Sequence, residues 1–403
     1  MADNKEYSRR EFFKLAGVAG AGSILLPGIA PAAEGEQPAQ ATEVPVRPFG
    51  KTGVNVSCLS LGTMFDIPSN QLLLRQALKW GVTYWDTADC YEGGNSEIGI
   101  GNFLKKNPDT RQKIFLVSKS DKRDPKGMSE LLDRSLKKMN TNYIDLYFVH
   151  GISGIDEVNN ETKAWAEKAK SQGKIKFFGF SAHSNMEDLL MKASKLGWID
   201  GIMMSYNYRL MRSDRMRAAV EACSKAGIGL TAMKTQGGGQ VSTSSETELQ
   251  MAGRFMKLGF TDAQAKLKAV WEEPNISSIC SQMPNMTILM SNIAAALNQT
   301  KLTADDLHLM DRYAAETASC YCAGCTSICE NAIAGKVPVG DIMRFLMYHN
   351  SYGDVQRARN SFAEIPPEIR DRLVDLDYSS AEKLCPQKLR IGALIRQATT
   401  VLA

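Results

Sequence analysis

The sequence predicts an α/β protein, namely a (β/α)8 TIM barrel with a mostly helical, cysteine-containing C-terminal extension. Three observations support this prediction. Eight short apolar runs alternate with amphipathic stretches from residue 57 onward, a pattern typical of parallel strands joined by helices. No G-x-G-x-x-G follows the first run, although a doubly wound nucleotide-binding sheet, the alternative fold, usually carries one. Four of the nine cysteines lie within residues 319–330, beyond the last run.

Residues 1–33 do not have the pattern of a folded segment. Arg9 and Arg10 precede the run LAGVAGAGSILLPGIA, which is short and glycine-rich for a membrane span. The arrangement resembles a Tat export signal with small residues for cleavage near Ala32; a disordered basic tail is the alternative. We therefore expect the Tat machinery to export the chain to the periplasm or cell envelope, with no membrane span in the mature chain. Because this route carries folded, cofactor-loaded proteins, export does not require the cysteines to form disulfides.

Residues 34–44 are predicted to be a polar linker, and the composition beyond them is that of a globular protein. The formal net charge is +4, from 48 Lys and Arg against 44 Asp and Glu. No basic stripe with interleaved aromatic residues occurs, so nucleic acid is not an expected partner. The densest charge run, residues 119–126, mixes both signs and is expected to be a solvated loop.

The barrel is predicted to span residues 45–300, and the extension residues 301–403. Eight βα units in about 240 residues suit a closed barrel. The predicted strands are 57–63, 83–86, 113–119, 143–150, 175–181, 200–207, 228–234 and 276–282.

Polar residues at the ends of these strands are the candidate catalytic groups, because active sites of such barrels form at the C-terminal ends of the strands. Asp86 closes the second predicted strand and Tyr91 follows it, while Lys119 and His150 close the third and fourth. One ionisable group at each of three successive strand ends favours a catalytic set over unrelated satisfied polar residues.

This set permits proton donation to a carbonyl group. A phenol has a pKa of about 10, and a neighbouring lysine ammonium lowers it. Asp86 can fix Lys119, and His150 can orient the carbonyl oxygen or share the proton. The set holds no hydride source, so a cofactor has to supply the hydride.

The sequence resembles the aldo-keto reductases over about residues 45–300. The segments that carry the resemblance are RPFGKTGVNVSCLSLGTM (47–64), WDTADCYEGGNSEIGIG (85–101), LVSKS (116–120), DLYFVHG (145–151), GFSAHS (179–184) and MKTQGGG (233–239). The resemblance implies that Asp86, Tyr91, Lys119 and His150 are the catalytic tetrad, with Tyr91 as general acid. It also implies hydride transfer between NADPH and an aldehyde or ketone without a metal.

The cofactor contacts implied by the resemblance match the family less closely. The candidates are Gly62, Thr63, Met64, Ser181, Tyr206, Lys234 and Asn292. The family pattern has asparagine, glutamine, arginine and an acid where this chain has Ala182, Met203, Ile288 and Ser291. Ile288 cannot pair with the 2′-phosphate of NADPH, so NADP(H) and NAD(H) both remain candidate cofactors.

The cysteine segment resembles a ferredoxin-like tail found in a Tat-exported branch of the family. Such tails carry two C-x2-C-x2-C-x3-C-P runs, and the fourth cysteine of each run ligates the other cluster. The first run here is Cys320, Cys322, Cys325 and Cys329, with one residue missing from its first spacing. Of the second run only Cys385 remains, because Asp375, Tyr378 and Ala381 stand at its other positions.

The tail therefore predicts one iron–sulfur cluster, a [4Fe–4S] cluster held by Cys320, Cys322, Cys325 and Cys385, with Cys329 as a free or substitute ligand. The alternative is a decayed tail that keeps only its helices, with or without a disulfide. Zinc is less favoured, since no histidine lies nearby and the spacing is not that of a zinc ribbon. Cys90, adjacent to Tyr91, is a candidate for lining the pocket, whereas Cys58, Cys223 and Cys280 are expected to be apolar fillers.

The leading hypothesis is an exported oxidoreductase that reduces a carbonyl, or oxidises an alcohol or sugar, with a nicotinamide cofactor. A second hypothesis is an electron-transfer protein whose cluster passes electrons to a redox centre bound in the barrel, with a separate redox partner as a candidate. A third is a binding module without catalysis, which the intact Asp86, Tyr91, Lys119 and His150 disfavour. No segment indicates which small molecule is the substrate.

Overall fold

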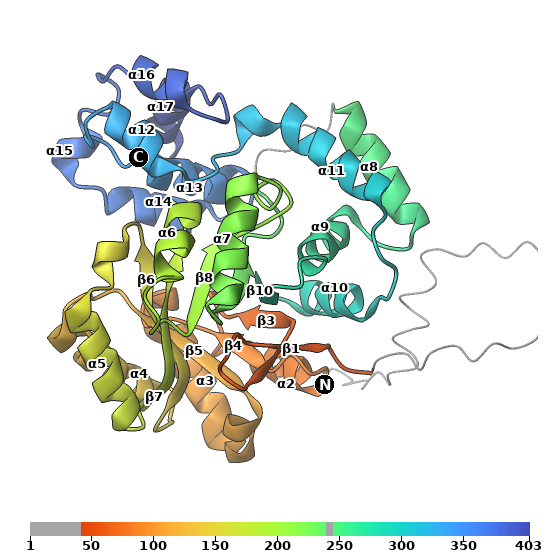
Figure 1. Ribbon diagram of the computed structural model, residues 1–403, viewed down its shortest axis with the longest axis vertical. Helices are drawn as coiled ribbons and strands as arrows, with labels where there is room; N and C mark the ends of the chain where they lie inside the picture. The colour runs from red at the N-terminus through yellow and green to blue at the C-terminus, as the bar shows by residue number, and fades with distance from the viewer. Residues whose placement is uncertain (1–41, 239–244) are drawn as a thin grey trace, which may run out of the picture.

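The computed structural model describes residues 42–238 and 245–403 (Figure 1). The predicted export signal and most of the predicted linker lie outside the described residues. Within the described part, the chain forms an α/β barrel followed by a helical extension, as the sequence predicts.

Eight parallel strands close into a barrel in the order β10-β3-β4-β5-β6-β7-β8-β9, which confirms the predicted fold class. Every residue of β5 and β8 is buried, because the faces of a parallel sheet are covered by side chains inside and helices outside. The strands are β3 (Leu59–Gly62), β4 (Tyr84–Asp86), β5 (Phe115–Ser120), β6 (Ile144–Ile152), β7 (Ile175–Ala182), β8 (Gly201–Ser205), β9 (Gly229–Met233) and β10 (Ile276–Gln282). Each lies in or overlaps one of the eight predicted runs.

A short antiparallel hairpin precedes the barrel and was not predicted from the sequence. It consists of β1 (Val46–Pro48) and β2 (Asn55–Ser57). Phe49 follows β1 and is completely buried among residues of the barrel interior. A Cβ atom at Gly229 would lie 2.6 Å from the Phe49 ring, and one at Gly201 would lie 2.8 Å from it. The two glycines, at the starts of β8 and β9, therefore leave space for the Phe49 ring at that end of the barrel.

Helices surround the barrel and connect its strands (Figure 1). Several begin with side-chain caps: Asp124, Asn159 and Ser213 accept hydrogen bonds from backbone N–H groups of the first turn, which otherwise lack partners. The helices of this part are α2 (Gln71–Lys79), η1 (Tyr91–Gly94), α3 (Asn95–Lys106), η2 (Pro108–Lys113), α4 (Pro125–Lys138), η3 (Ile155–Glu157), α5 (Asn160–Ser171), α6 (Met186–Ala193), α7 (Asp214–Lys225), α8 (Glu246–Lys257), α9 (Asp262–Trp271) and α10 (Met286–Leu297).

The extension is helical and has a hydrophobic core of its own, which includes Ile342, Leu346, Phe362 and Ile395. Its first helix packs against α8, whereas the others gather at one end of the molecule (Figure 1). Its helices are α11 (Ala304–Glu316), η4 (Ala318–Cys320), α12 (Thr326–Ala332), α13 (Val339–Asn350), α14 (Val355–Ala363), α15 (Pro367–Arg370), α16 (Ser379–Leu384) and α17 (Ile391–Val401).

The extension contacts the loops that follow β7 and β8. The side chain of Asn185 donates to the Thr326 hydroxyl at 2.9 Å, and the side chain of Asn207 donates to the Tyr321 hydroxyl at 2.9 Å. Both asparagines follow the C-terminal end of a strand, where barrel active sites form. The extension thus lies beside the catalytic end of the barrel.

In the part of the chain that the structure describes, no helix is both long and apolar enough to cross a membrane.

Candidate active site

The four predicted catalytic residues come together at the C-terminal end of the barrel. Asp86 is the last residue of β4, and Lys119 and His150 lie near the ends of β5 and β6. Tyr91 begins the short helix η1, which turns back over the barrel after β4. Neighbouring parallel strands end side by side, so residues about 30 apart in sequence meet at the same end of the barrel.

Lys119 is the centre of the arrangement. Its Nζ lies 2.8 Å from each carboxylate oxygen of Asp86, donates to the Thr87 carbonyl at 2.7 Å, and lies 3.1 Å from the Tyr91 hydroxyl. Lys119 and Asp86 are only 1% and 2% exposed. The ammonium therefore has defined partners on three sides, and one of them is the candidate acid.

Burial and neighbouring charges shift the pKa values of Lys119 and Tyr91 in opposite directions. Burial alone would lower the pKa of Lys119, but Asp86 and Tyr91 outweigh it, and the pKa is raised. Burial raises the pKa of the Tyr91 hydroxyl, while Lys119 acts in the opposite direction without cancelling it. The sequence predicted the lowering by Lys119 but not the larger effect of burial. Tyr91 thus keeps its proton at neutral pH, as a proton donor must.

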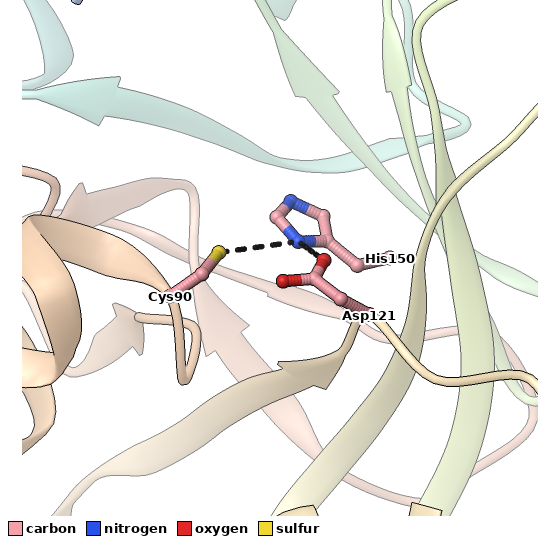
Figure 2. A group of neighbouring side chains, drawn as sticks. All are labelled: Cys90, Asp121 and His150. Atoms are coloured by element: carbon pink, nitrogen blue, oxygen red, sulfur yellow. Dashed lines mark hydrogen bonds and ion pairs between the residues drawn. The ribbon is translucent and has the colours of Figure 1, made fainter. Parts of the chain in front are cut away.

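His150 completes the set from the other side of Tyr91. The two rings meet edge to face, with centroids 5.8 Å apart and an interplanar angle of 70°. Nδ1 of His150 lies 2.7 Å from a carboxylate oxygen of Asp121 and 3.7 Å from Sγ of Cys90 (Figure 2). Asp121 was not singled out in the sequence, where it belongs to a run of mixed charge. Asp121 directly follows β5, and this position at the end of a strand could have identified it as a candidate.

The candidate cofactor residues are distributed around the same end of the barrel. Thr63 is buried, and its hydroxyl donates to the Asp86 carbonyl at 2.7 Å. The carbonyl of Met64 accepts from Gln282 at 2.6 Å. Ser181 accepts from the N–H of Gly151 at 2.9 Å.

Three further candidates differ in where they lie. Asn292, on α10, donates to the Ser281 hydroxyl at 3.0 Å. A Cβ atom at Gly62 would lie 3.1 Å from the Ser281 backbone, so this strand end is closely packed. Tyr206 is 1% exposed and belongs to the main hydrophobic core, and its N–H donates to the Met233 carbonyl at 3.0 Å.

Lys234 lies where the barrel meets the extension. Its Nζ is 3.0 Å from Nδ1 of His183, and both residues line a pocket that Cys322 and Arg344 also line. Burial lowers the pKa of Lys234 well below its usual value, and Arg344 adds to this effect. Lys234 is thus shared between the barrel and the extension.

Comparison with known proteins now adds to this geometry. The sequence profile of the Aldo/keto reductase family matches residues 59–303. This chain belongs to the aldo/keto reductase family.

The individual proteins that this chain resembles are distant from it in sequence. The uncharacterized oxidoreductase YqkF of Bacillus subtilis is 27% identical over 292 residues, which are 64% of this chain and 92% of YqkF. The aldo-keto reductase yakc [NADP(+)] of Schizosaccharomyces pombe is 28% identical over 204 residues, 46% of this chain and 59% of that protein. The structure of the aldo-keto reductase AKR11C1 from Bacillus halodurans (holo form) has a TM-score of 0.57 at 22% identity, covering 67% of this chain and 96% of that one.

The five candidate cluster cysteines lie beyond the part that matches the aldo/keto reductases. Cys322, Cys325, Cys329 and Cys385 line one small pocket together with apolar residues such as Val339 and Ile391. Cys320 lies at the end of η4, is exposed, and lines the other pocket, beside Lys234. The structure therefore groups Cys329 with three of the predicted ligands. Cys320 lies outside this small pocket, but it shares the pocket beside Lys234 with one of the three, Cys322.

Proposed function

We propose that this aldo/keto reductase reduces a carbonyl group of a small molecule, or oxidises an alcohol or sugar, with a nicotinamide nucleotide. The observation that carries the proposal is the buried Lys119 ammonium, which contacts both the Asp86 carboxylate and the Tyr91 hydroxyl. We also propose export by a Tat signal to the periplasm or cell envelope, which rests on Arg9 and Arg10 before an apolar run.

Each residue of the tetrad has a separate task in this proposal. Tyr91 donates the proton to the carbonyl oxygen as that oxygen gains negative charge. Lys119 stabilises the phenolate that remains, because its ammonium lies 3.1 Å from the hydroxyl. Asp86 holds the ammonium in place from the opposite side. His150 orients the carbonyl oxygen next to Tyr91.

The residues of the barrel rim fit a nicotinamide nucleotide in part. A bound nucleotide would supply or accept the hydride, and Ser181, Met64 and Asn292 are the residues that would hold it. The hydroxyl of Ser181 accepts from Gly151 and still has its own proton to donate. Ile288, on the first turn of α10, is 38% exposed and uncharged, so it offers a 2′-phosphate no ion pair.

A fluorescence titration of the full chain with NADPH and with NADH tests this proposal. We expect saturable binding of a nucleotide, with NADH bound at least as tightly as NADPH, because a charge-assisted hydrogen bond worth about 1.5–3 kcal/mol is missing at Ile288. Ser181→Ala should weaken binding by about 2–10-fold. Ser194→Ala, at the outer end of α6, is the matched control. A folded, empty barrel that binds neither nucleotide would contradict the hydride mechanism.

A second candidate function is electron transfer through an iron–sulfur cluster in the extension, with a redox partner. It is favoured by the pocket that Cys322, Cys325, Cys329 and Cys385 line. Sulfur ligands of a single zinc ion lie about 3.8 Å apart, but among the described residues no three of these sulfur atoms lie within 4.8 Å of one another. A [4Fe–4S] cluster holds its four cysteine sulfurs farther apart than a single zinc ion does. Burial raises the pKa of Cys322 and of Cys329 to about 12, so both thiols stay protonated unless a metal displaces their protons.

Serine substitutions of single cysteines test the cluster and its ligands. We expect about four iron atoms and four sulfide ions per chain after anaerobic purification. Cys329→Ser should lower both contents and alter the electron paramagnetic resonance signal of the reduced protein. Cys320→Ser should leave them unchanged, which makes it the matched control. Loss of iron in Cys320→Ser but not in Cys329→Ser would favour the ligand set predicted from spacing. A wild-type protein without iron would exclude the cluster.

A further inference from the structure

Three potential metal ligands converge at the rim of the candidate active site. Among residues 42–238 and 245–403, Cys90, Asp121 and His150 form the one group whose sulfur, oxygen and nitrogen atoms all lie within 4.8 Å of one another. They come from three separate places: the turn after β4, the residue after β5, and β6. Figure 2 shows the thiol and the carboxylate both directed at Nδ1 of His150, while the other ring nitrogen points away from them.

Hydrogen bonds link the three side chains to one another. Nδ1 carries at most one hydrogen, and Asp121 at 2.7 Å is the partner that can share it. The Cys90 sulfur lies 3.7 Å from the same Nδ1, and its thiol has a hydrogen of its own, which it can donate to the Asp121 carboxylate.

The three ligand atoms also lie close to the separations that a divalent cation requires. With usual bond lengths, the nitrogen, oxygen and sulfur ligands of a tetrahedral zinc ion lie about 3.3–3.6 Å apart. The Cys90 sulfur is already near that separation from Nδ1, and Asp121 has to retreat by a fraction of an ångström. Asp121 is half exposed at its side chain, with 47% accessible, and can make this adjustment. Solvent reaches the site, so an ion can enter.

We propose that Cys90, Asp121 and His150 bind a Zn2+ ion, with a fourth position left for water. On binding, Cys90 loses its proton to solvent and its sulfur bonds the metal as a thiolate. The proton on Nδ1 of His150 is displaced, and the neutral ring carries its proton on the other nitrogen, Nε2. Three protein ligands and an open position are typical of zinc sites that are not purely structural.

The location gives the ion a consequence for the chemistry proposed above, and this part rests on that proposed function. Cys90 immediately precedes Tyr91, and His150 is the residue assigned to orient the carbonyl. Occupancy would determine which nitrogen of His150 carries a proton, and hence which nitrogen can donate to a substrate oxygen. The ion would thus act as a regulator at the active-site rim.

Cobalt(II) is a spectroscopic probe for this site that does not depend on enzymatic activity. The full chain, with any cluster retained, is titrated with Co2+ and then with Zn2+. We expect one equivalent of Co2+ to give a thiolate charge-transfer band and the intense visible bands of tetrahedral coordination, and we expect Zn2+ to displace it. Cys90→Ser should abolish the charge-transfer band. Asp121→Asn should lower the affinity for Co2+ by about 10-fold or more. Removing a residue that only contacts a metal ligand already costs about this much, and Asp121 is proposed to bind the metal directly.

Cys320→Ser is the matched control, because Cys320 is also exposed but lies outside the group. Cysteines of the extension contribute equally to the Co2+ spectra of wild type and Cys90→Ser. Subtracting one spectrum from the other therefore leaves only the signal of Cys90. Identical Co2+ spectra for these two proteins, with both folded by circular dichroism, would overturn the proposal. A lack of nucleotide binding in the separate titration would leave the metal result unaffected, so the two proposals can fail independently.

Discussion

Tyr91→Phe is expected to lower the turnover number for carbonyl reduction by about 10²–10⁴-fold, the usual contribution of a positioned general acid. The substitution removes only the hydroxyl that lies 3.1 Å from Nζ of Lys119. The phenyl ring keeps its edge-to-face contact with His150, so the pocket should keep its shape. Single-turnover rates of nucleotide oxidation, measured with a panel of aldehydes and ketones, are the appropriate measurement. Nucleotide affinity should stay within about twofold of wild type, since Tyr91 is not among the residues assigned to the cofactor.

Tyr84→Phe is the matched control for this experiment. Tyr84 is buried in the barrel interior and shares a hydrogen bond with the Thr231 hydroxyl at 3.1 Å. Its loss should cost about 1 kcal/mol of stability and leave turnover near wild type. If Tyr91→Phe retained more than a third of the wild-type rate, another group would have to be the acid. Equal losses in both variants would indicate a general effect of losing a buried hydroxyl.

The barrel could be predicted because its strands are buried on both faces. Such strands are continuous apolar runs, and all eight were found this way. The hairpin of β1 and β2 was missed, since strands of three residues are too short to show a period. The placement of the extension was also beyond the sequence, because it depends on contacts such as Asn185 with Thr326, which lie 141 residues apart.

The candidate site could be predicted in part, because several of its residues end the same apolar runs that mark the strands. Asp86, Lys119 and His150 each close an apolar run, so the sequence marks them directly. Tyr206 also ends such a run, but its side chain packs into the core, and the sequence does not show to which side a residue beyond the strand end turns. Cys320 was preferred to Cys329 on spacing alone. The turn of η4 leaves Cys320 outside the small pocket that the other four cysteines of the extension line, which only the fold reveals.

Lys119→Met is expected to destabilise the protein by about 3–5 kcal/mol, because it leaves the buried Asp86 carboxylate without its cation. Methionine has a similar length, so loss of packing should contribute little. Burial raises the pKa of Asp86 against the pull of Lys119, and without Lys119 that rise should be larger. The destabilisation should therefore be complete at pH values above the folded-state pKa. It should shrink as the pH falls from the Asp86 pKa of the folded variant towards the raised Asp86 pKa of the folded wild type, below which Asp86 is protonated in both proteins. Urea denaturation at several pH values measures this dependence.

The double variant Asp86→Leu/Lys119→Met separates the structural role of the pair from its catalytic role. Replacing both partners with apolar residues removes the uncompensated charge, so stability should return to within about 2 kcal/mol of wild type, or exceed it. Turnover should not return, because neither the ammonium that favours the Tyr91 phenolate nor the carboxylate that positions it is present. A double variant that recovered both would show that Lys119 and Asp86 are a structural ion pair only. One that recovered neither would show that the site cannot accommodate the two apolar side chains, and Asp86→Asn with Lys119 retained would then test the catalytic role alone.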